Sequence, residues 1–121
     1  IDATPALKAH FEAGRLRPVG VVSARRSPTL PNVEGMQEAG VAGVNVIAWT
    51  GVTAPAKTPR KLIDTLNAHL NAILKEPDTK TFFNNQGYET AGGTPEEFGR
   101  LLAEEVATWT RVIRTAKIQF D

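Results

Sequence analysis

The sequence contains no cysteine, so disulfide bonds, thiol nucleophiles and thiolate metal sites are excluded from these 121 residues. It also lacks an excess of either charge, with 14 Lys and Arg against 13 Asp and Glu. A nucleic-acid interface needs a clustered basic face. Arg15, Arg17, Arg25 and Arg26 instead flank a predicted strand as its solvated ends. We therefore expect no nucleic-acid partner.

Long hydrophobic runs are missing as well. No apolar stretch approaches the roughly 20 residues that a transmembrane helix requires, and no secretory signal is visible at the N-terminus. The chain begins at Ile1 rather than Met, so we expect it to be a processed, truncated or excised piece of a longer protein. Its 121 residues suit one domain or part of one.

Residue types that carry catalysis or bind metals are sparse and scattered. His10 and His69 lie far apart, and neither has a carboxylate or a second histidine at ligand spacing, so we interpret both as surface residues. Ser23 and Ser27 lack the sequence of a nucleophile elbow. The glycine pair at 92–93 is not followed by Lys-Ser or Lys-Thr, which favours a helix entry over a phosphate loop. We expect no enzyme activity, no metal and no cofactor.

What the sequence does contain is a strand, a short loop and a capped helix in succession. Residues 44–53 are rich in β-branched and aromatic side chains and predict a buried strand, in which Gly51 indicates a bend or the close approach of another backbone or a ligand. Pro55 ends strand pairing because it has no amide hydrogen. Thr58 is placed to cap a helix that opens at Pro59. This unit is typical of an α/β protein.

The rest of the chain continues the alternation of strands and helices. We predict helices at 4–13 with Thr4 as cap, at 33–39, at 59–75, at 77–86, and from a capping box of Thr94 and Glu97 to about residue 117. Further strands are predicted at 1–3, 16–23 and 88–91. In the helix at 59–75, leucines and isoleucines recur at helical spacing on one side, while Asp64, Asn67 and Asn71 take the other.

Several short motifs follow one another in a specific order. They are GRLR at 14–17 and VSARRSP at 22–28, LPNV at 30–33 and EAG at 38–40, WTGVTAP at 49–55, TP at 58–59 before a helix with LN at 66–67, and Gly87 followed by GGTPEEF at 92–98. In order and spacing, the chain resembles the C-terminal portion of the periplasmic solute-binding receptors of the tripartite tricarboxylate transporter family, also called Bug or TctC-like receptors.

The chain departs from that family in places. Thr50 stands where the family usually has a second aromatic residue beside the Trp, Lys57 takes a position that is commonly Gly, and Glu34-Gly35 replaces the usual Pro-Thr. The first departure alters an expected wall of the ligand cleft, so the size and polarity of the ligand stay open. Family members are also much longer, with a signal peptide and an N-terminal half.

The resemblance implies an α/β fold of the type II periplasmic-binding-protein kind, in which sheets flanked by helices form two lobes. Residues 1–44 would end the second lobe, 45–55 would be the crossing strand and hinge, and 56–121 would complete the first lobe with its terminal helix. It implies a periplasmic receptor that binds a small organic acid without catalysis and delivers it to membrane permease subunits. Half of such a protein exposes apolar surface, so the missing N-terminal half or self-association should cover it.

By the same resemblance, we expect the ligand to contact six residues: Asp2, Ala3, Thr4, Trp49, Thr50 and Gly51. The first three begin a helix after a strand end, where unpaired amides favour an anion. The charge of Asp2 competes with an anionic ligand, so it would orient water or bind an amine; alternatively Asp2 and Thr4 only cap the helix. Trp49 lines the cleft or packs in the sheet, and Gly51 serves as a hinge.

Two other classes of protein remain as alternatives. The effector-sensing domain of a transcription regulator can share the two-lobed architecture, and this is an analogy of fold alone. A fragment of an α/β enzyme is the second, although no nucleophile, base and orienting group converge in the sequence. The upstream coding sequence separates them, because a receptor begins with a signal peptide and a regulator with a helix-turn-helix.

Overall fold

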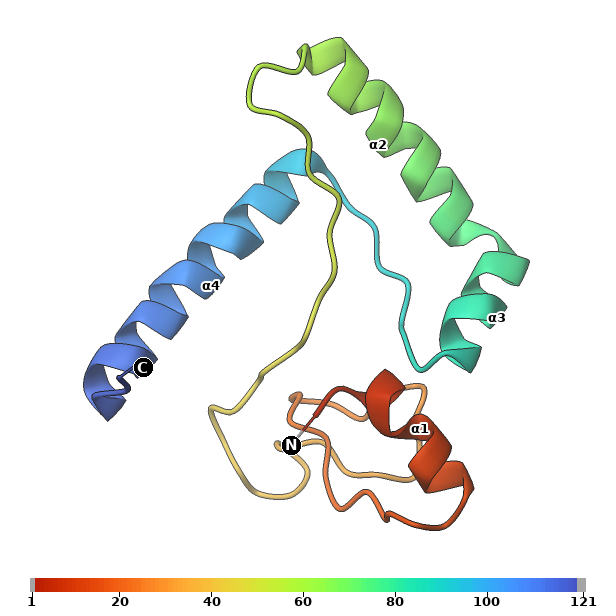
Figure 1. The fold of residues 1–121 in the computed structure, drawn as a ribbon, viewed down its shortest axis with the longest axis vertical. Helices are drawn as coiled ribbons and strands as arrows, with labels where there is room; N and C mark the ends of the chain where they lie inside the picture. The colour runs from red at the N-terminus through yellow and green to blue at the C-terminus, as the bar shows by residue number, and fades with distance from the viewer. Residues whose placement is uncertain (1, 120–121) are drawn as a thin grey trace. The chain divides into compact units, whose positions relative to one another are not determined.

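A computed structural model describes residues 2–119, which form four α-helices joined by extended and turn-rich segments (Figure 1). The helices are α1 (Thr4–Glu12), α2 (Arg60–Lys75), α3 (Pro77–Asn85) and α4 (Pro95–Ala116). The chain divides into two compact units. Unit 1 comprises Ile1–Thr50 and Ala72–Ala91, and unit 2 comprises Gly51–Asn71 and Gly92–Asp121. The chain therefore passes between the units after residues 50, 71 and 91.

Helix α1 begins at Thr4, one residue before Pro5, which the capping prediction makes the first helical residue. Ala3 is the N-cap residue, with φ −70° and ψ 140°, and no side chain caps the helix. Thr4 is the first helical residue, so the predicted role of Thr4 as cap is wrong. The prediction relied on the preference of Thr for the N-cap and of Pro for the first helical position; here the extended N-cap conformation falls on Ala3, whose amide donates to the carboxylate of Asp2.

The segment that follows α1 in unit 1 is held by backbone hydrogen bonds. The Val21 amide donates to the Glu34 carbonyl at 2.9 Å and the Met36 amide donates to the Ser23 carbonyl at 2.9 Å, which makes one isolated parallel bridge between Val21 and Gly35. On the other side, the Val46 amide donates to the Val22 carbonyl at 2.8 Å. Residues 21–23 thus have a neighbour on each side without forming a ladder.

The predicted strands do not form as strands in the described residues. Segments 16–23, 44–53 and 88–91 carry no strand apart from the bridge at Val21, and Ile1 of the predicted strand 1–3 lies outside the described residues. A strand forms only where another strand pairs with its backbone along its length. A high β-propensity means that the side chains suit the surface of a sheet, and it does not make an unpaired segment a strand. The predicted helix at 33–39 is also wrong, because Gly35 pairs with Val21 in the isolated bridge and turns follow it.

The other helices confirm the predictions from local signals. Helices α2, α3 and α4 each begin and end within one residue of the predicted bounds. The capping box of α4 is complete, since the Glu97 amide donates to Thr94 Oγ1 at 3.1 Å and the Thr94 amide donates to Glu97 Oε2 at 2.7 Å. At the other end, Lys117 closes α4 in the left-handed region with φ 52°. These ends are specified by residues adjacent in sequence.

Neither unit has a hydrophobic core within residues 2–119. Among these residues no hydrophobic side chain is buried. The apolar side of α2 is open, with Leu62 49% exposed, Leu66 47% and Ile73 48%, and on α4 Val106 is 65% exposed. Burial of apolar surface normally supplies the main favourable term in folding. The predicted exposure of apolar surface is therefore confirmed.

The capping box predicts a pH dependence for α4. The pKa of the Glu97 carboxyl lies below its ordinary value of 4.5, first because the Thr94 backbone amide donates to it and then because of a hydrogen bond with the Thr94 side chain. The unfolded chain binds this proton more tightly, so the box stabilises α4 above about pH 4.5 and loses this effect as pH falls through the lowered pKa.

An NMR titration of the Glu97 carboxyl carbon measures this directly. Replacing Thr94→Val should raise the pKa only part of the way to 4.5, because the backbone amide remains. A wild-type midpoint at or above 4.5 would contradict the assignment.

Candidate functional site

The predicted ligand-binding residues at the start of α1 already share one hydrogen bond. The Ala3 amide donates to Asp2 Oδ1 at 2.8 Å. The Ala6 amide donates to the Ala3 carbonyl at 3.0 Å, and Pro5 has no amide hydrogen. Asp2 thus occupies one donor of the helix start with its own carboxylate, and the predicted competition between Asp2 and an anion remains a prediction.

A glycine that follows α3 packs against this helix start. Gly87, which follows α3 with φ 85°, is buried against Thr4 and Pro5, and a Cβ there would lie 3.2 Å from the Pro5 nitrogen. Only glycine adopts this backbone conformation readily and leaves such space. The end of α3 therefore positions the beginning of α1 within unit 1.

The second predicted group lies on the extended segment at 49–51. Trp49 is 41% exposed, and Thr50 and Gly51 are exposed. Gly51 is a point of close approach, as predicted, but the neighbour is the ring of Phe98 in the first turns of α4 rather than a backbone or a ligand. A Cβ at Gly51 would overlap that ring. The expected roles of these three residues in binding and of Gly51 as a hinge remain predictions.

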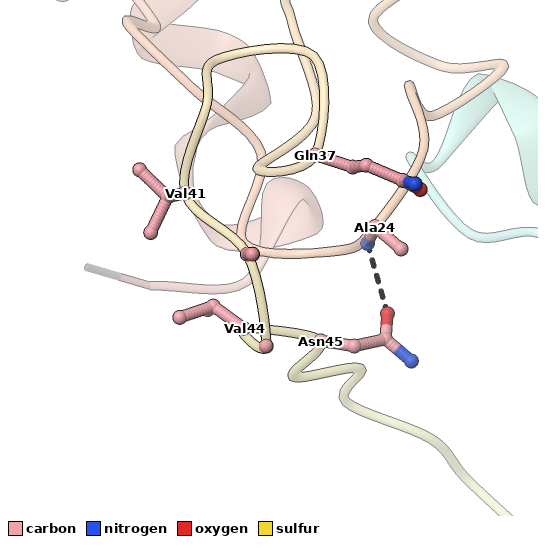
Figure 2. Close-up of a pocket in the computed structure, with 7 residues that line it drawn as sticks. Ala24, Gln37, Val41, Val44 and Asn45 are labelled. Carbon is pink, nitrogen blue, oxygen red and sulfur yellow. Dashed lines mark hydrogen bonds between the residues drawn. The ribbon is translucent and has the colours of Figure 1, made fainter.

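A hollow of unit 1 lies elsewhere. It measures about 320 Å³ and is bordered by Ala24, Gln37 and residues 41–45 (Figure 2). Its one internal hydrogen bond joins the Ala24 amide to Asn45 Oδ1 at 2.9 Å, as Figure 2 shows. A second hollow follows the last turns of α4, along Arg111, Val112 and residues 115–116. Neither includes any of the six predicted ligand-binding residues.

The densest polar arrangement of unit 2 surrounds the start of α4. It consists of four side chains of α2 that we call the polar stripe: Arg60, Asp64, Asn67 and Asn71. Their spacing of four, three and four residues places them on one helix face. Asn67 and Asn71 bond Gly93, and Arg60 bonds Glu96. The polar stripe therefore faces the start of α4 and not only solvent.

Charge is balanced within this arrangement. Arg60 Nε lies 2.7 Å from Asp64 Oδ1, and Arg60 Nη1 lies 2.5 Å from Glu96 Oε1. The pKa of Arg60 is raised, first by the hydrogen bond with Asp64 and then by that with Glu96. The pKa of Glu96 is lowered, first by a hydrogen bond from its own backbone amide and then by Arg60. With its guanidinium shared between two carboxylates, Arg60 is not an open anion site.

Other kinds of site find no support in residues 2–119. In this range no three His, Cys, Asp or Glu side chains gather as metal ligands. No helix of the described chain has the length and apolar character needed to cross a bilayer.

Comparisons with solved structures place the chain within a known architecture. It aligns with the structure described as R. palustris Rpa4515 with adipate at a TM-score of 0.81 and 36% identity, over 94% of this chain and 38% of that one. It aligns with the periplasmic binding protein BugD at a TM-score of 0.76 and 29% identity, over 93% of this chain and 38% of that one. The chain thus shares the fold of part of a periplasmic binding protein.

Sequence relatives lead to a specific family. The UPF0065 protein in the tcbD-tcbE intergenic region of Pseudomonas sp. is 38% identical over 93% of this chain and 34% of its own length. Protein BugT of Bordetella pertussis is 32% identical over 94% of this chain and 35% of its own length. Residues 1–118 match the tripartite tricarboxylate transporter family receptor, and the chain belongs to that family of receptors. It spans about a third of the length of these relatives.

The family prediction is therefore confirmed, whereas the polar stripe was missed. Asn67 and Asn71 were interpreted as the solvent side of an amphipathic helix, which is the common role of such residues. The sequence does contain a signal for this contact. Arg60 and Asp64 lie on the same helix face as the two asparagines, and the GGTPEE segment offers backbone groups that such polar side chains can bond. Nothing in the sequence indicates which loop such side chains bond.

Gly51 offers a test of close packing. We expect Gly51→Ala to destabilise the chain by about 1 kcal/mol, because the added methyl group displaces the Phe98 ring. The free energy of unfolding in urea measures this. The matched control is Gly51→Ala in a Phe98→Ala background, where the cost should disappear. An equal cost in both backgrounds would contradict the assignment of the cost to the Phe98 ring.

Proposed function

We propose that this chain is part of an extracytoplasmic solute-binding receptor that captures a small carboxylate for a tripartite tricarboxylate transporter. The observation that carries the proposal is the match of residues 1–118 to the receptor family, joined to a TM-score of 0.81 with a neighbour described with adipate. The receptor closes on its ligand, delivers it to membrane permease subunits and breaks no bond. BugD is described as a periplasmic binding protein, which supports the same location here.

The ligand class we propose is a small mono- or dicarboxylate. Amide groups at the start of α1 suit such a ligand, since backbone donors and the helix dipole both favour negative charge. The Asp2 carboxylate bonded to the Ala3 amide at 2.8 Å occupies a position that a ligand carboxylate would otherwise take. Binding would then require Asp2 to release this amide. We retain Ala3, Thr4, Trp49, Thr50 and Gly51 as the accompanying contacts.

For the complete receptor we propose sheets flanked by helices in two lobes. Residues 1–44 would end the second lobe, 45–55 would cross between the lobes, and 56–121 would complete the first. The backbone bonds on both sides of residues 21–23 support this, because they have the pattern of a sheet that lacks the rest of its ladder. The extended segment at 44–53 would pair with strands from the remainder of the receptor.

The exposed apolar faces support a proposal about the partner that covers them. The polar stripe of α2 is engaged at the start of α4, while the leucines on another side of α2 are about half exposed. The chain also covers only 38% of each structural neighbour. We propose that the remaining part of the receptor covers these faces, and that the isolated chain self-associates through them.

A binding measurement on the full-length receptor tests the ligand site. We expect Thr4→Val to weaken adipate binding about fivefold, because one hydroxyl hydrogen bond to the carboxylate is lost. Isothermal titration calorimetry measures the dissociation constant. The matched control is Thr81→Val on α3, which should leave it unchanged.

Two results would count against the proposal in different ways. Unchanged affinity in Thr4→Val would remove Thr4 from the site while leaving the receptor function intact. Absence of binding by the wild-type receptor to adipate and to related mono- and dicarboxylates would overturn the ligand class itself.

A further inference from the structure

The loop at 37–45, which forms most of the border of the hollow in Figure 2, is held at both of its ends. Just before the loop, the Met36 amide donates to the Ser23 carbonyl at 2.9 Å. Just after it, the Val46 amide donates to the Val22 carbonyl at 2.8 Å. Because two adjacent residues hold the two ends, the loop is closed at its base. A loop that is already closed loses less freedom when a ligand binds to it.

Arg26 adds a side-chain anchor at the beginning of this loop. Its Nε donates to Glu38 Oε2 at 2.7 Å, and its Nη1 donates to the Pro31 carbonyl at 3.1 Å. Its Nη2 lies 3.9 Å from Glu34 Oε1. A guanidinium is planar and presents its donors in a fixed arrangement, so these contacts orient the chain at 31–38. The charge of Arg26 is shared between two carboxylates and is not directed into the hollow.

The lining of the hollow is apolar apart from two carboxamides. Small-molecule sites measure roughly 300–1,000 Å³ and are lined mainly by apolar groups with a few polar ones; this hollow measures about 320 Å³. In the view of Figure 2, Val41 and Val44 lie on one side, while the carboxamides of Gln37 and Asn45 extend to the other. None of the described residues that border the hollow is ionisable. A charged ligand would therefore find no counter-charge in the lining, which favours a neutral one.

Both carboxamides keep hydrogen-bonding groups available to a ligand. The Ala24 amide can only donate, so its bond of 2.9 Å fixes Oδ1 as the atom of Asn45 that faces it and leaves Nδ2 as a donor. Neither Asn45 Nδ2 nor the carboxamide of Gln37 bonds any other residue of the range 2–119. The backbone amides of residues 42–45 also donate to no residue of that range. The hollow thus offers several donors and, at Gln37 Oε1, an acceptor.

We propose that this hollow is a second binding site, for a small neutral amide with a short aliphatic body. The ligand carbonyl accepts from Asn45 Nδ2, and the ligand amide nitrogen donates to Gln37 Oε1. The aliphatic body covers Val41, which is 45% exposed, and the neighbouring Val44. None of the six predicted ligand-binding residues borders the hollow, so the proposal is independent of the carboxylate site at the start of α1.

Titration of the full-length receptor with isobutyramide, followed by NMR of the side-chain carboxamides, tests this site. The signals of Asn45 and Gln37 should shift and saturate with a dissociation constant on the order of 1 mM, which is reasonable for so small a ligand. The signals of Asn67 and Asn71 in unit 2 should not shift. Isobutyrate has nearly the same shape but carries a charge, so it should bind at least about tenfold more weakly.

A variant that preserves the loop separates binding from folding. Asn45→Asp keeps an acceptor for the Ala24 amide and loses the donor to the ligand, so isobutyramide should bind about tenfold more weakly. The matched control is Asn32→Asp, the same change outside the hollow, which should leave the dissociation constant unchanged. The proposal is overturned if the wild-type signals show no saturable shift, if isobutyrate binds as tightly as isobutyramide, or if Asn45→Asp folds and binds isobutyramide as the wild type does.

Discussion

The constraint that governs this chain is the requirement of apolar side chains for a surface on which to pack. No hydrophobic residue is buried among residues 2–119, although the helices carry apolar faces at regular spacing. Hydrophobic burial is the dominant favourable term for an ordinary domain. Capping, turns and side-chain hydrogen bonds instead account for the local order of each unit. A protein organised in this way needs more apolar contact than these residues provide for one another.

The polar and the apolar face of helix α2 make different kinds of contact. Its polar stripe bonds the start of α4 through Arg60 and the two asparagines, and this use of a polar face is unusual for an amphipathic helix. Its leucines remain partly exposed and could pack against another surface. The two relatives described above are about three times as long as this chain, and we propose that residues corresponding to their additional length offer that surface. The polar contacts set the geometry of the helix ends, and under the proposed function the remaining part of the receptor would supply the apolar contacts.

Local signals explain which parts of the fold could be predicted from sequence. The capping box at Thr94 and the periodicity of α2 are encoded within one or two helical turns, and both were correct. The strand at 44–53 depends on partners along its length, which local sequence does not supply. The hydrogen bonds between Asn71 and Gly93 were missed for a related reason, because they join residues 22 positions apart. Of the candidate site, the hydrogen bond from the Ala3 amide to Asp2 was not predicted from the sequence, and the membership of Trp49 in a cleft remains a prediction.

Residue-level footprinting with hydroxyl radicals tests the central claim most directly. The account predicts that Leu62, Leu66 and Leu70 are labelled when the chain is studied alone and become protected in the full-length receptor. The comparison isolates the contribution of the additional residues, since the helix itself is present in both samples. Equal labelling in the two samples, with α2 folded in each, would contradict the claim that this face belongs to a larger receptor.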